Sequence, residues 1–301
     1  MNKDFSASAL RYRPQKFQEV IGQDAIVKTL LNAIKNDSLA QALLFCGPRG
    51  VGKTTCARIL AKEINKVEAD YDYNIFELDA ANNAGVEDIR TLIDQFRIPP
   101  QIGKYKVYII DEVHMLSKQA FNAFLKSLEE PPNHVIFILA TTEKNKIIPT
   151  ILSRCQIFEF KKIDQIQIEE SLRKICKENK IDFEDEALNL IASKSDGAMR
   201  DALVMFDRLV TFTNGKLSLN EVSINLNTLD LDTYFNFSDL ILSSSIPDIL
   251  SKYNEIVNKG FDGLSFISGL SRHYREMLIS KFADSQKISI YSDSILSLIH
   301  I

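Results

Sequence analysis

Long apolar runs are missing from this sequence of 301 residues. No apolar run approaches the roughly 18 residues that a helix needs to cross a bilayer. The first 14 residues include Lys3, Asp4 and Arg11 and contain no apolar stretch of the kind found in signal peptides. We therefore expect a cytoplasmic protein without a membrane segment.

Paired cysteines and a basic charge excess are also missing. The four cysteines include no CxxC pair, which favours reduced thiols over a disulfide scaffold. The formal net charge of -4 excludes a protein that coats nucleic acid through charge alone, although a local basic site remains compatible with it. Hydrophobic residues at 45% and charged residues at 25% are typical of globular proteins, and the length predicts two or three domains.

The first half of the chain alternates short apolar runs with helical patterns. Five runs that are apolar on both faces predict buried parallel strands, at residues 42–46, 75–78, 107–110, 135–140 and 157–160. Before and between them, apolar residues recur with helical spacing behind Asp24 and behind Ser117, each of which we interpret as an N-cap. The order predicts an α/β domain with helices on both faces of the sheet.

Strand patterns end near residue 164, and helical patterns follow. Residues 168–175, 187–191 and 203–210 predict three helices, and residues 219–225 a short fourth. Residues 227–232 have the composition of a linker, and two more helical stretches follow it. We predict domains at 1–163, 164–226 and 227–301, the last short or truncated because residues 298–301 are apolar and uncapped.

A phosphate-binding loop is the strongest signal in the sequence. Residues 47–54 read GPRGVGKT and match G-x-x-x-x-G-K-[ST] between a predicted strand and a predicted helix. Such a loop directs backbone N–H groups at phosphate oxygens, while Lys53 neutralises the β- and γ-phosphates and Thr54 binds Mg²⁺. The residues that we expect at the nucleotide are Gly47, Pro48, Arg49, Gly50, Val51, Gly52, Lys53, Thr54 and Thr55.

Two adjacent carboxylates follow the predicted strand 107–110. Asp111 at a strand end is placed to reach the Mg²⁺ ligand shell, and Glu112 to accept a proton from the attacking water. Adjacent acids also often cap a helix, but beside the phosphate loop they favour a hydrolytic site. For His114 we prefer a packed role beside the site over a catalytic one.

Six segments in a fixed order carry a resemblance to a known family. They are GPRGVGKT, DEVHML at 111–116, LEEPP at 128–132, ATTEKNKI at 140–147, ILSRC at 151–155 and DGAMRDAL at 196–203. Together they resemble the gamma/tau family of DNA polymerase III, the AAA+ ATPases of the bacterial clamp loader. The resemblance implies an AAA+ P-loop domain with a five-stranded parallel sheet, a helical lid and a helical collar.

The resemblance also implies roles for three residues outside the loop. Thr142 would sense the γ-phosphate, Arg200 would contact the phosphates from the lid, and Arg154 would act in trans as an arginine finger in a neighbour's site. Local sequence alone would instead favour a surface salt bridge for Arg154. It would likewise favour a helix-terminal pair of Arg200 with Asp196 or Asp201.

The N-terminal segment would bind the base of the nucleotide. The resemblance to the family implies that Val20 and Ile21 enclose the adenine, with Tyr12 and Arg13 nearby. A hydrophobic staple ahead of the helix that follows Asp24 is the alternative interpretation of the two apolar residues.

The sequence departs from many relatives in one place. They insert a four-cysteine zinc module after the phosphate-loop helix, whereas residues 62–74 contain no cysteine here. Structural zinc needs four convergent ligands, so we predict no zinc. The four cysteines are scattered, at Cys46, Cys56, Cys155 and Cys176.

Lys126 is the only residue that we assign to DNA, because its position matches one near the DNA backbone in the family. A solvated helix lysine is the alternative. The stretch 82–85 lacks the basic residues that contact phosphates, so DNA binding would depend on several subunits acting together.

The resemblance implies an ATP- and Mg²⁺-dependent motor that opens a sliding clamp and closes it on primed DNA. Its partners would be other clamp-loader subunits in a hetero-oligomeric ring, the clamp, primed DNA and, through the holoenzyme, the polymerase core. DNA-directed DNA polymerase (nucleotidyltransferase) activity would belong to another subunit of that complex. The alternatives are a non-hydrolysing clamp-loader scaffold and another AAA+ DNA motor such as a branch-migration helicase.

Overall fold

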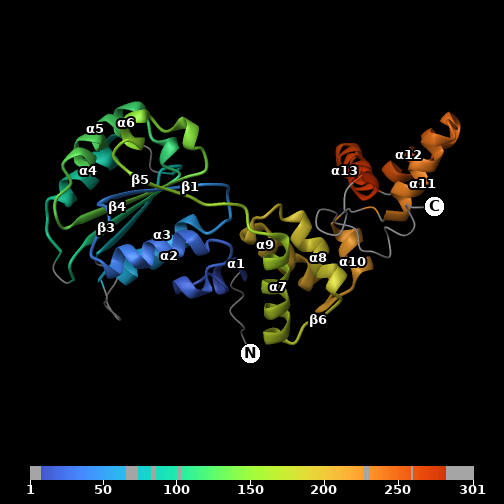
Figure 1. The fold of residues 1–301 in the computed structure, drawn as a ribbon, viewed down its shortest axis with the longest axis horizontal. Helices are drawn as coiled ribbons and strands as arrows, with labels where there is room; N and C mark the ends of the chain where they lie inside the picture. The colour runs from blue at the N-terminus through green and yellow to red at the C-terminus, as the bar shows by residue number, and fades with distance from the viewer. Residues whose placement is uncertain are drawn as a thin grey trace. The chain divides into compact units, whose positions relative to one another are not determined.

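The computed structural model describes residues 8–65, 74–82, 86–100, 103–226, 229, 231–258 and 260–282 (Figure 1). The chain divides into two compact units, Met1–Gly215 and Lys216–Ile301. Of the segments interpreted above, residues 1–7, 66–73, 83–85, 227–228, 230 and 298–301 lie outside the described residues. No helix within the described ranges combines the length and the hydrophobicity that crossing a bilayer requires.

A five-stranded parallel sheet forms the centre of the first unit. Its order is β2-β3-β4-β1-β5, which confirms the predicted parallel sheet, with each strand end within one residue of the predicted one. The strands are β1 (Ala42–Cys46), β2 (Ile75–Asp79), β3 (Lys106–Asp111), β4 (Val135–Thr141) and β5 (Gln156–Glu159). Strands β1, β3 and β4 are almost completely buried, which explains why their sequences are apolar on both faces.

The register of the sheet brings several strand ends to one edge. Cys46 at the end of β1 pairs with Thr141 at the end of β4, and Asp79 at the end of β2 pairs with Asp111 at the end of β3. Strand β1 lies between β4 and β5, so β2, β3 and β4 lie on one side of it and β5 lies on the other. The direction in which the chain adds strands to the sheet therefore changes beside β1. Ligands of open α/β sheets bind at this position, outside the carboxyl ends of the strands.

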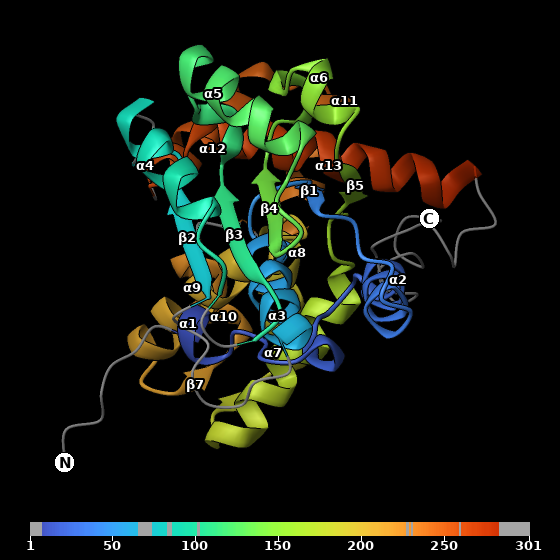
Figure 2. The ribbon, with the colours of Figure 1, turned by 90° about the vertical axis from the view of Figure 1, so that its left-hand side faces the viewer.

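Helices cover both faces of the sheet, as predicted (Figure 1). On one face lie α2 (Asp24–Lys35) and α3 (Lys53–Asn65), over a core that includes Leu30, Phe45 and Leu60. On the other lie α4 (Val86–Phe96), α5 (Lys118–Glu129) and α6 (Pro149–Leu152). The core on that face contains the aromatic side chains of Phe96, Tyr108, Phe124 and Phe137. Figure 2 shows β2, β3 and β4 side by side between these layers.

Short helical elements lie between the strands and longer helices or before them. They are α1 (Ser8–Arg11), η1 (Phe17–Glu19), η3 (Val113–Met115) and η4 (Lys144–Lys146).

The structure tests the two predicted helix caps. Asp24 is the first residue of α2 and Gln23 is its N-cap, so the interpretation of Asp24 as the cap was wrong by one position. Ser117 caps α5 as predicted, because its side chain accepts a hydrogen bond from Ala120 N.

Three helices follow β5 in the first unit. They are α7 (Gln165–Asn179), α8 (Asp185–Lys194) and α9 (Met199–Phe212), which matches the three helical patterns in the sequence. Their buried side chains include Leu172, Leu188 and Phe206. A two-residue strand, β6 (Asp182–Phe183), interrupts the helices, and it was not predicted because two residues show no alternation.

In the part of the second unit that the structure describes, the regular elements are helices apart from β7 (Lys216–Leu217). Its helices are α10 (Leu219–Asn225), α11 (Leu231–Leu242), α12 (Ile246–Asn258) and α13 (Gly263–Phe282). Tyr234, Phe237, Ile256 and Phe266 form its core. Leu250 in α12 is 59% exposed.

Candidate active site

A cavity of about 1,050 Å³ opens at the carboxyl edge of the sheet in the first unit. Its walls come from the N-terminal segment, the phosphate loop, the end of β3 and helices α7 and α9. The predicted site residues that line it are Tyr12, Arg13, Val20, Ile21, Arg49, Gly50, Val51, Gly52, Lys53, Thr54, Thr55, Asp111, Glu112 and Arg200. Residues far apart in the sequence therefore converge on one space large enough for a nucleotide.

The glycines of the phosphate loop are required by its backbone. Gly47 has φ +149° and Gly50 has φ +78°, conformations that residues with a side chain rarely adopt. A Cβ at Gly47 would lie 2.4 Å from the carbonyl oxygen of Phe160, and one at Gly50 would lie 3.1 Å from Cβ of Ala198. The loop thus passes close to the end of β5 on one side and to the start of α9 on the other.

Lys53 lies at the first position of α3 and is buried, with 6% of its surface exposed. Its amine donates hydrogen bonds to the carbonyl oxygens of Gly47 and Pro48 at 2.8 and 2.7 Å. Burial lowers the pKa of Lys53, and the nearby carboxylates of Glu112 and Asp111 oppose that shift. A desolvated cation inside a loop of N–H donors is an anion-binding arrangement.

Two oxygen groups suitable for a hard cation meet beside the loop. The hydroxyl of Thr54 donates to Asp111 Oδ2 at 2.6 Å, and Asp111 Oδ1 accepts from the backbone N–H of Glu112 at 2.9 Å. Mg²⁺ in phosphate sites is held by one or two such protein oxygens together with substrate oxygens. The pair fits that ion. Within the described ranges no group of three or more His, Cys, Asp or Glu is arranged to hold a metal by protein ligands alone.

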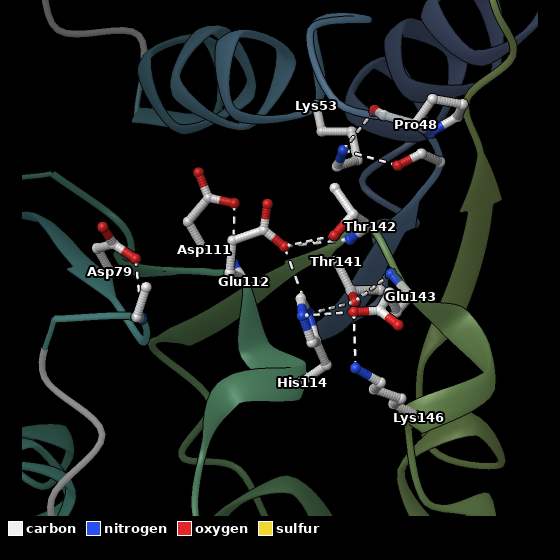
Figure 3. A network of polar contacts seen from close by, with 12 residues as sticks. Pro48, Lys53, Asp79, Asp111, Glu112, His114, Thr141, Thr142, Glu143 and Lys146 are labelled. Carbon is white, nitrogen blue, oxygen red and sulfur yellow. Dashed lines mark hydrogen bonds and ion pairs between the residues drawn. The ribbon is translucent and has the colours of Figure 1, made fainter. Parts of the chain in front are cut away.

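Glu112 follows β3 in a left-handed conformation, with φ 47° and ψ 43°. This conformation is uncommon for a residue with a side chain and is often found at functional sites. Oε2 of Glu112 accepts hydrogen bonds from the hydroxyl and the backbone N–H of Thr142, at 2.9 and 3.2 Å. The ends of β3 and β4 are therefore linked through this carboxylate (Figure 3).

His114 is packed beside these groups, and its side chain is 6% exposed. Nδ1 lies 3.1 Å from the hydroxyl oxygen of Thr141 and 3.3 Å from Oε2 of Glu112. Nε2 lies 3.3 Å from Oε1 of Glu143, which also pairs with Lys146 at 2.8 Å. His114 does not line the cavity, which agrees with the packed role preferred from the sequence.

The N-terminal segment forms the opposite wall of the cavity. The Tyr12 hydroxyl accepts a hydrogen bond from the side-chain amide of Asn179 in α7 at 2.5 Å, and Ser8 N donates to Asp207 in α9 at 2.7 Å. Burial lowers the pKa of Arg13, and Arg58 and Arg200 lower it further through charge repulsion. Cations gathered in this way favour an anionic ligand.

Arg200 lines the cavity from the first turn of α9, and its side chain is exposed. Its backbone N–H lies 3.4 Å from the carbonyl oxygen of Gly50, so the start of α9 contacts the phosphate loop. Asp196, one of the two partners expected for a helix-terminal pair, instead pairs with Lys162 at 2.6 Å.

Sequence reasoning missed two residues that hold the walls of the cavity together. Gln23 is 3% exposed, and its amide donates to the carbonyl oxygen of Lys161 at 2.8 Å and to that of Val51 at 3.5 Å. It links the phosphate loop to the segment between β5 and α7. The other is Asn179, the partner of Tyr12. Neither belongs to a recognisable motif, so no local signal identified them.

Arg154 and Lys126 lie outside the cavity. Arg154 follows α6, and its guanidinium contacts Glu129 Oε1 at 2.7 Å and the carbonyl oxygen of Thr150 at 2.8 Å. Its side chain is 34% exposed, so it is not enclosed by its own unit. Lys126 lies on the outward face of α5.

None of the four cysteines lines the cavity. Cys46, Cys56 and Cys176 are buried, Cys155 is partly buried, and all four are free thiols. Burial raises the pKa of Cys56 to about 12, which keeps this thiol protonated and unreactive at neutral pH.

Two family models match the chain. The model described as DNA polymerase III, delta subunit matches residues 64–164, and the one described as DNA polymerase III clamp loader subunit, ATPase lid domain matches residues 167–215. The second match coincides with helices α7 to α9, which carry Arg200 and Asn179.

Curated relatives extend the similarity over nearly the whole chain. The chain is 40% identical to DNA polymerase III subunit tau of Bacillus subtilis over 289 residues, which cover 90% of this chain and 51% of the relative. It is 35% identical to DNA polymerase III subunit gamma of Buchnera aphidicola subsp. Baizongia pistaciae, over 93% of this chain and 80% of the relative. The chain spans about half the length of the tau subunits of Bacillus subtilis and, at 43%, Salmonella typhimurium.

Solved structures support the fold. The RuvB Holliday junction branch migration motor of Thermotoga maritima aligns with a TM-score of 0.58 at 22% identity, over 76% of this chain and 79% of that chain. A point variant of the same motor aligns with a TM-score of 0.58 at 21% identity, over 83% and 91% of the two chains. At this identity the likeness shows a shared fold. Taken with the length and identity of the match to the gamma subunit, the sequence and the fold place the chain in one family: it belongs to the gamma/tau subunits of DNA polymerase III.

Proposed function

We propose that the chain is the ATP-hydrolysing motor subunit of a bacterial clamp loader, which places a sliding clamp on primed DNA. The observation that carries this proposal is the convergence of Lys53, Thr54, Asp111, Glu112 and Thr142 at one edge of the sheet. A binding module without catalysis does not need a carboxylate held beside the phosphate loop.

The phosphate loop and its lysine would bind the triphosphate. Backbone N–H groups of residues 47–54 and the α3 N-terminus would face the phosphates, and Lys53 would exchange its contacts with the Gly47 and Pro48 carbonyl oxygens for phosphate oxygens. The adenine would lie against Val20 and Ile21, with Tyr12 and Arg13 completing that wall. Arg200 would contact the phosphates from α9.

Hydrolysis requires a proton acceptor and charge stabilisation. Glu112 would accept a proton from the water that attacks the γ-phosphorus, while the bond from that phosphorus to the β–γ bridging oxygen breaks. Thr142 would orient the same water and the γ-phosphate. Thr54 and Asp111 would hold Mg²⁺, which neutralises the charge that develops on the β- and γ-phosphate oxygens.

Arg154 would complete the site of a neighbouring subunit. It lies outside its own cavity and is partly exposed, so it is available to a second molecule once its contact with Glu129 is exchanged. An arginine supplied in trans is worth roughly 10³–10⁵ in rate in comparable NTPases. Hydrolysis would therefore depend on assembly.

Assembly would use the helical second unit. We infer a domain division at 1–163, 164–226 and 227–301, the last forming the collar of a ring with other clamp-loader subunits. Support comes from apolar side chains that are exposed there, including Leu242 at 80% and Leu264 at 76%. Single exposed apolar residues are ordinary, but several on one helical unit favour an interface. Lys126 on α5 would contribute a contact to the DNA backbone.

The alternatives account for fewer observations. A non-hydrolysing scaffold of this fold does not require Lys53, Thr54, Asp111 and Glu112 together. The shared architecture with RuvB keeps a branch-migration motor in view as a second candidate. Retention of this chain on the sliding clamp rather than on a four-way DNA junction would favour the clamp loader.

Steady-state ATP hydrolysis, measured with the other clamp-loader subunits, tests the proposal. We expect the sliding clamp and primed DNA to stimulate turnover. Lys53→Ala should abolish nucleotide binding, whereas Glu112→Gln should keep binding and lose turnover. Absence of stimulated hydrolysis in the intact assembly, or full turnover by Glu112→Gln, would refute the proposed activity.

A further inference from the structure

His114 occupies a position that the proposed reaction does not explain. Its ring is buried between two carboxylates, with Nδ1 3.3 Å from Oε2 of Glu112 and Nε2 3.3 Å from Oε1 of Glu143 (Figure 3). The third neighbour is the hydroxyl of Thr141, 3.1 Å from Nδ1. His114 is not among the residues that line the cavity.

The carboxylates of Glu112 and Glu143 differ in their other hydrogen-bond and ion-pair partners. Glu143 already pairs with Lys146 at 2.8 Å, at the exposed side of the network. Glu112 receives two donors from Thr142, both on Oε2, and among the described residues none donates to Oε1. A donor from His114 Nδ1 would add a third hydrogen bond to Oε2 and leave Oε1 free for the cavity.

Proton placement on the ring follows from the acceptors. An unprotonated Nδ1 can accept a hydrogen bond from the Thr141 hydroxyl, but its lone pair would then also lie 3.3 Å from Oε2 of Glu112, a carboxylate oxygen that only accepts. With a proton on Nδ1, two acceptor oxygens lie near it, Thr141 Oγ1 at 3.1 Å and Glu112 Oε2 at 3.3 Å. The Thr141 oxygen is itself fixed by the backbone N–H of Glu143 at 3.0 Å.

We propose that His114 is a positioning residue for the proposed hydrolysis: its Nδ1–H holds Oε2 of Glu112 and so aims Oε1 at the attacking water. The inference rests on the proposed function of Glu112. The left-handed backbone at Glu112 determines the direction in which its side chain leaves the chain. Hydrogen bonds from His114 and Thr142 would then determine the position of the carboxylate. Displacing a reacting group by about 1 Å can cost on the order of 100-fold in rate.

Two conservative variants separate the two ring nitrogens. The side-chain nitrogen of Asn is separated from Cβ by one carbon, as Nδ1 is in His, whereas that of Gln is separated by two carbons, as Nε2 is. His114→Asn therefore keeps a donor toward Glu112, and His114→Gln keeps one toward Glu143. Glu143→Gln serves as a control, because it alters the Nε2 side without touching Glu112.

Turnover at saturating ATP, KM and nucleotide affinity would be measured in the complete assembly. We expect His114→Gln to lower kcat by roughly 10- to 100-fold with little change in KM. His114→Asn should lie within about fivefold of the unmodified protein, since it restores the donor. Equal losses in both variants, retention in both, or retention only in His114→Gln would overturn the assignment. Thermal melts of each variant separate misfolding from loss of position.

A second measurement does not depend on activity. Long-range ¹H–¹⁵N correlation spectra of the histidine rings would report which nitrogen of His114 carries a proton in the nucleotide-free protein. We expect Nδ1 to be protonated, and an unprotonated Nδ1 would overturn the inference. If the assembly hydrolyses no ATP although Nδ1 is protonated, the proposed ATPase function is refuted, whereas the proposed hydrogen bond from His114 to Glu112 is retained.

Discussion

Gly47 is the residue at which the phosphate loop leaves least room for a side chain. Its φ of +149° and the nearby carbonyl oxygen of Phe160, 2.4 Å from an added Cβ, act together. Gly52 shares the positive φ, at +101°, but an added Cβ there would meet nothing within 4 Å. Comparing substitutions at these two glycines therefore separates the energetic cost of backbone strain from the cost of a steric clash.

Gly47→Ala should therefore lower the free energy of unfolding more than Gly52→Ala. We expect roughly 2–4 kcal/mol for Gly47→Ala, from collision plus strain, and roughly 1–2 kcal/mol for Gly52→Ala, from strain alone. Urea denaturation without nucleotide measures both. Equal losses would show that the approach to Phe160 has no energetic consequence.

Stability should fall at alkaline pH because of buried thiols such as Cys56. Burial raises its pKa from 9.0 to about 12, so between these values the unfolded chain has lost the thiol proton and the folded chain retains it. The unfolded state then binds fewer protons, and stability decreases as pH rises, by at most about 1.4 kcal/mol per pH unit for one thiol.

Cys56→Ala should make this pH dependence shallower. The comparison is between slopes of unfolding free energy from about pH 8 to about pH 10.5, a window that spans the ordinary thiol pKa, because the substitution also changes packing at every pH. Tyr108, whose pKa burial raises to about 12, contributes in the same direction and remains in both proteins. Identical slopes would contradict a protonated, buried Cys56.

The residues that sequence identified and those that it missed differ in a physical way. Lys53, Thr54 and Asp111 belong to patterns in which the spacing itself carries the chemistry. Gln23 and Asn179 act through partners that only the folded chain supplies, the carbonyl of Lys161 and the hydroxyl of Tyr12. Each of these is a single hydrogen bond between residues far apart in the sequence, so it produces no sequence pattern from which it could be predicted.

Helix α5 shows how a local signal determines an element boundary. Ser117 precedes the helix with an extended backbone, and its hydroxyl accepts a hydrogen bond from Ala120 N at 3.2 Å. Side-chain caps of this type satisfy one of the N–H groups that the first turn leaves open.

Ser117→Ala should destabilise the protein by about 1 kcal/mol, because the Ala120 N–H loses its acceptor. Ser117→Asp should preserve stability, since aspartate caps equally well and its charge favours a helix N-terminus. Thermal denaturation of the two variants gives the comparison. Equal destabilisation by both would indicate that Ser117 contributes through packing instead.

Strands were easier to predict than helix boundaries or short elements. Buried parallel strands require continuous apolar sequences, so β1, β3 and β4 were evident, with ends within one residue. The cap of α2 was misplaced because Asp24 is a better capping residue than Gln23, whose amide is engaged elsewhere. Helix α4 was not anticipated.

At the scale of the whole molecule, the cavity depends on segments from the entire first unit. The start of α9 meets the phosphate loop at Gly50, and the N-terminal segment is tied to α7 through Tyr12 and Asn179. A nucleotide in this cavity would contact all of these segments at once. Family membership and the phosphate loop followed from the sequence, whereas this arrangement of walls required the structure.

Arg154 provides the most direct test of the account, because the site is proposed to be incomplete within one chain. The measurement is ATP turnover of the assembled clamp loader with clamp and primed DNA, for Arg154→Ala and for Glu129→Ala. Glu129 is the matched control, since its loss breaks the same 2.7 Å ion pair but leaves the guanidinium in place.

We predict that Arg154→Ala lowers turnover by roughly 10³-fold or more while nucleotide affinity is kept. Glu129→Ala should retain turnover, because an exposed ion pair contributes little to stability. Equal losses in the two variants, or robust turnover by isolated Arg154→Ala protein, would contradict a site that a neighbouring subunit completes.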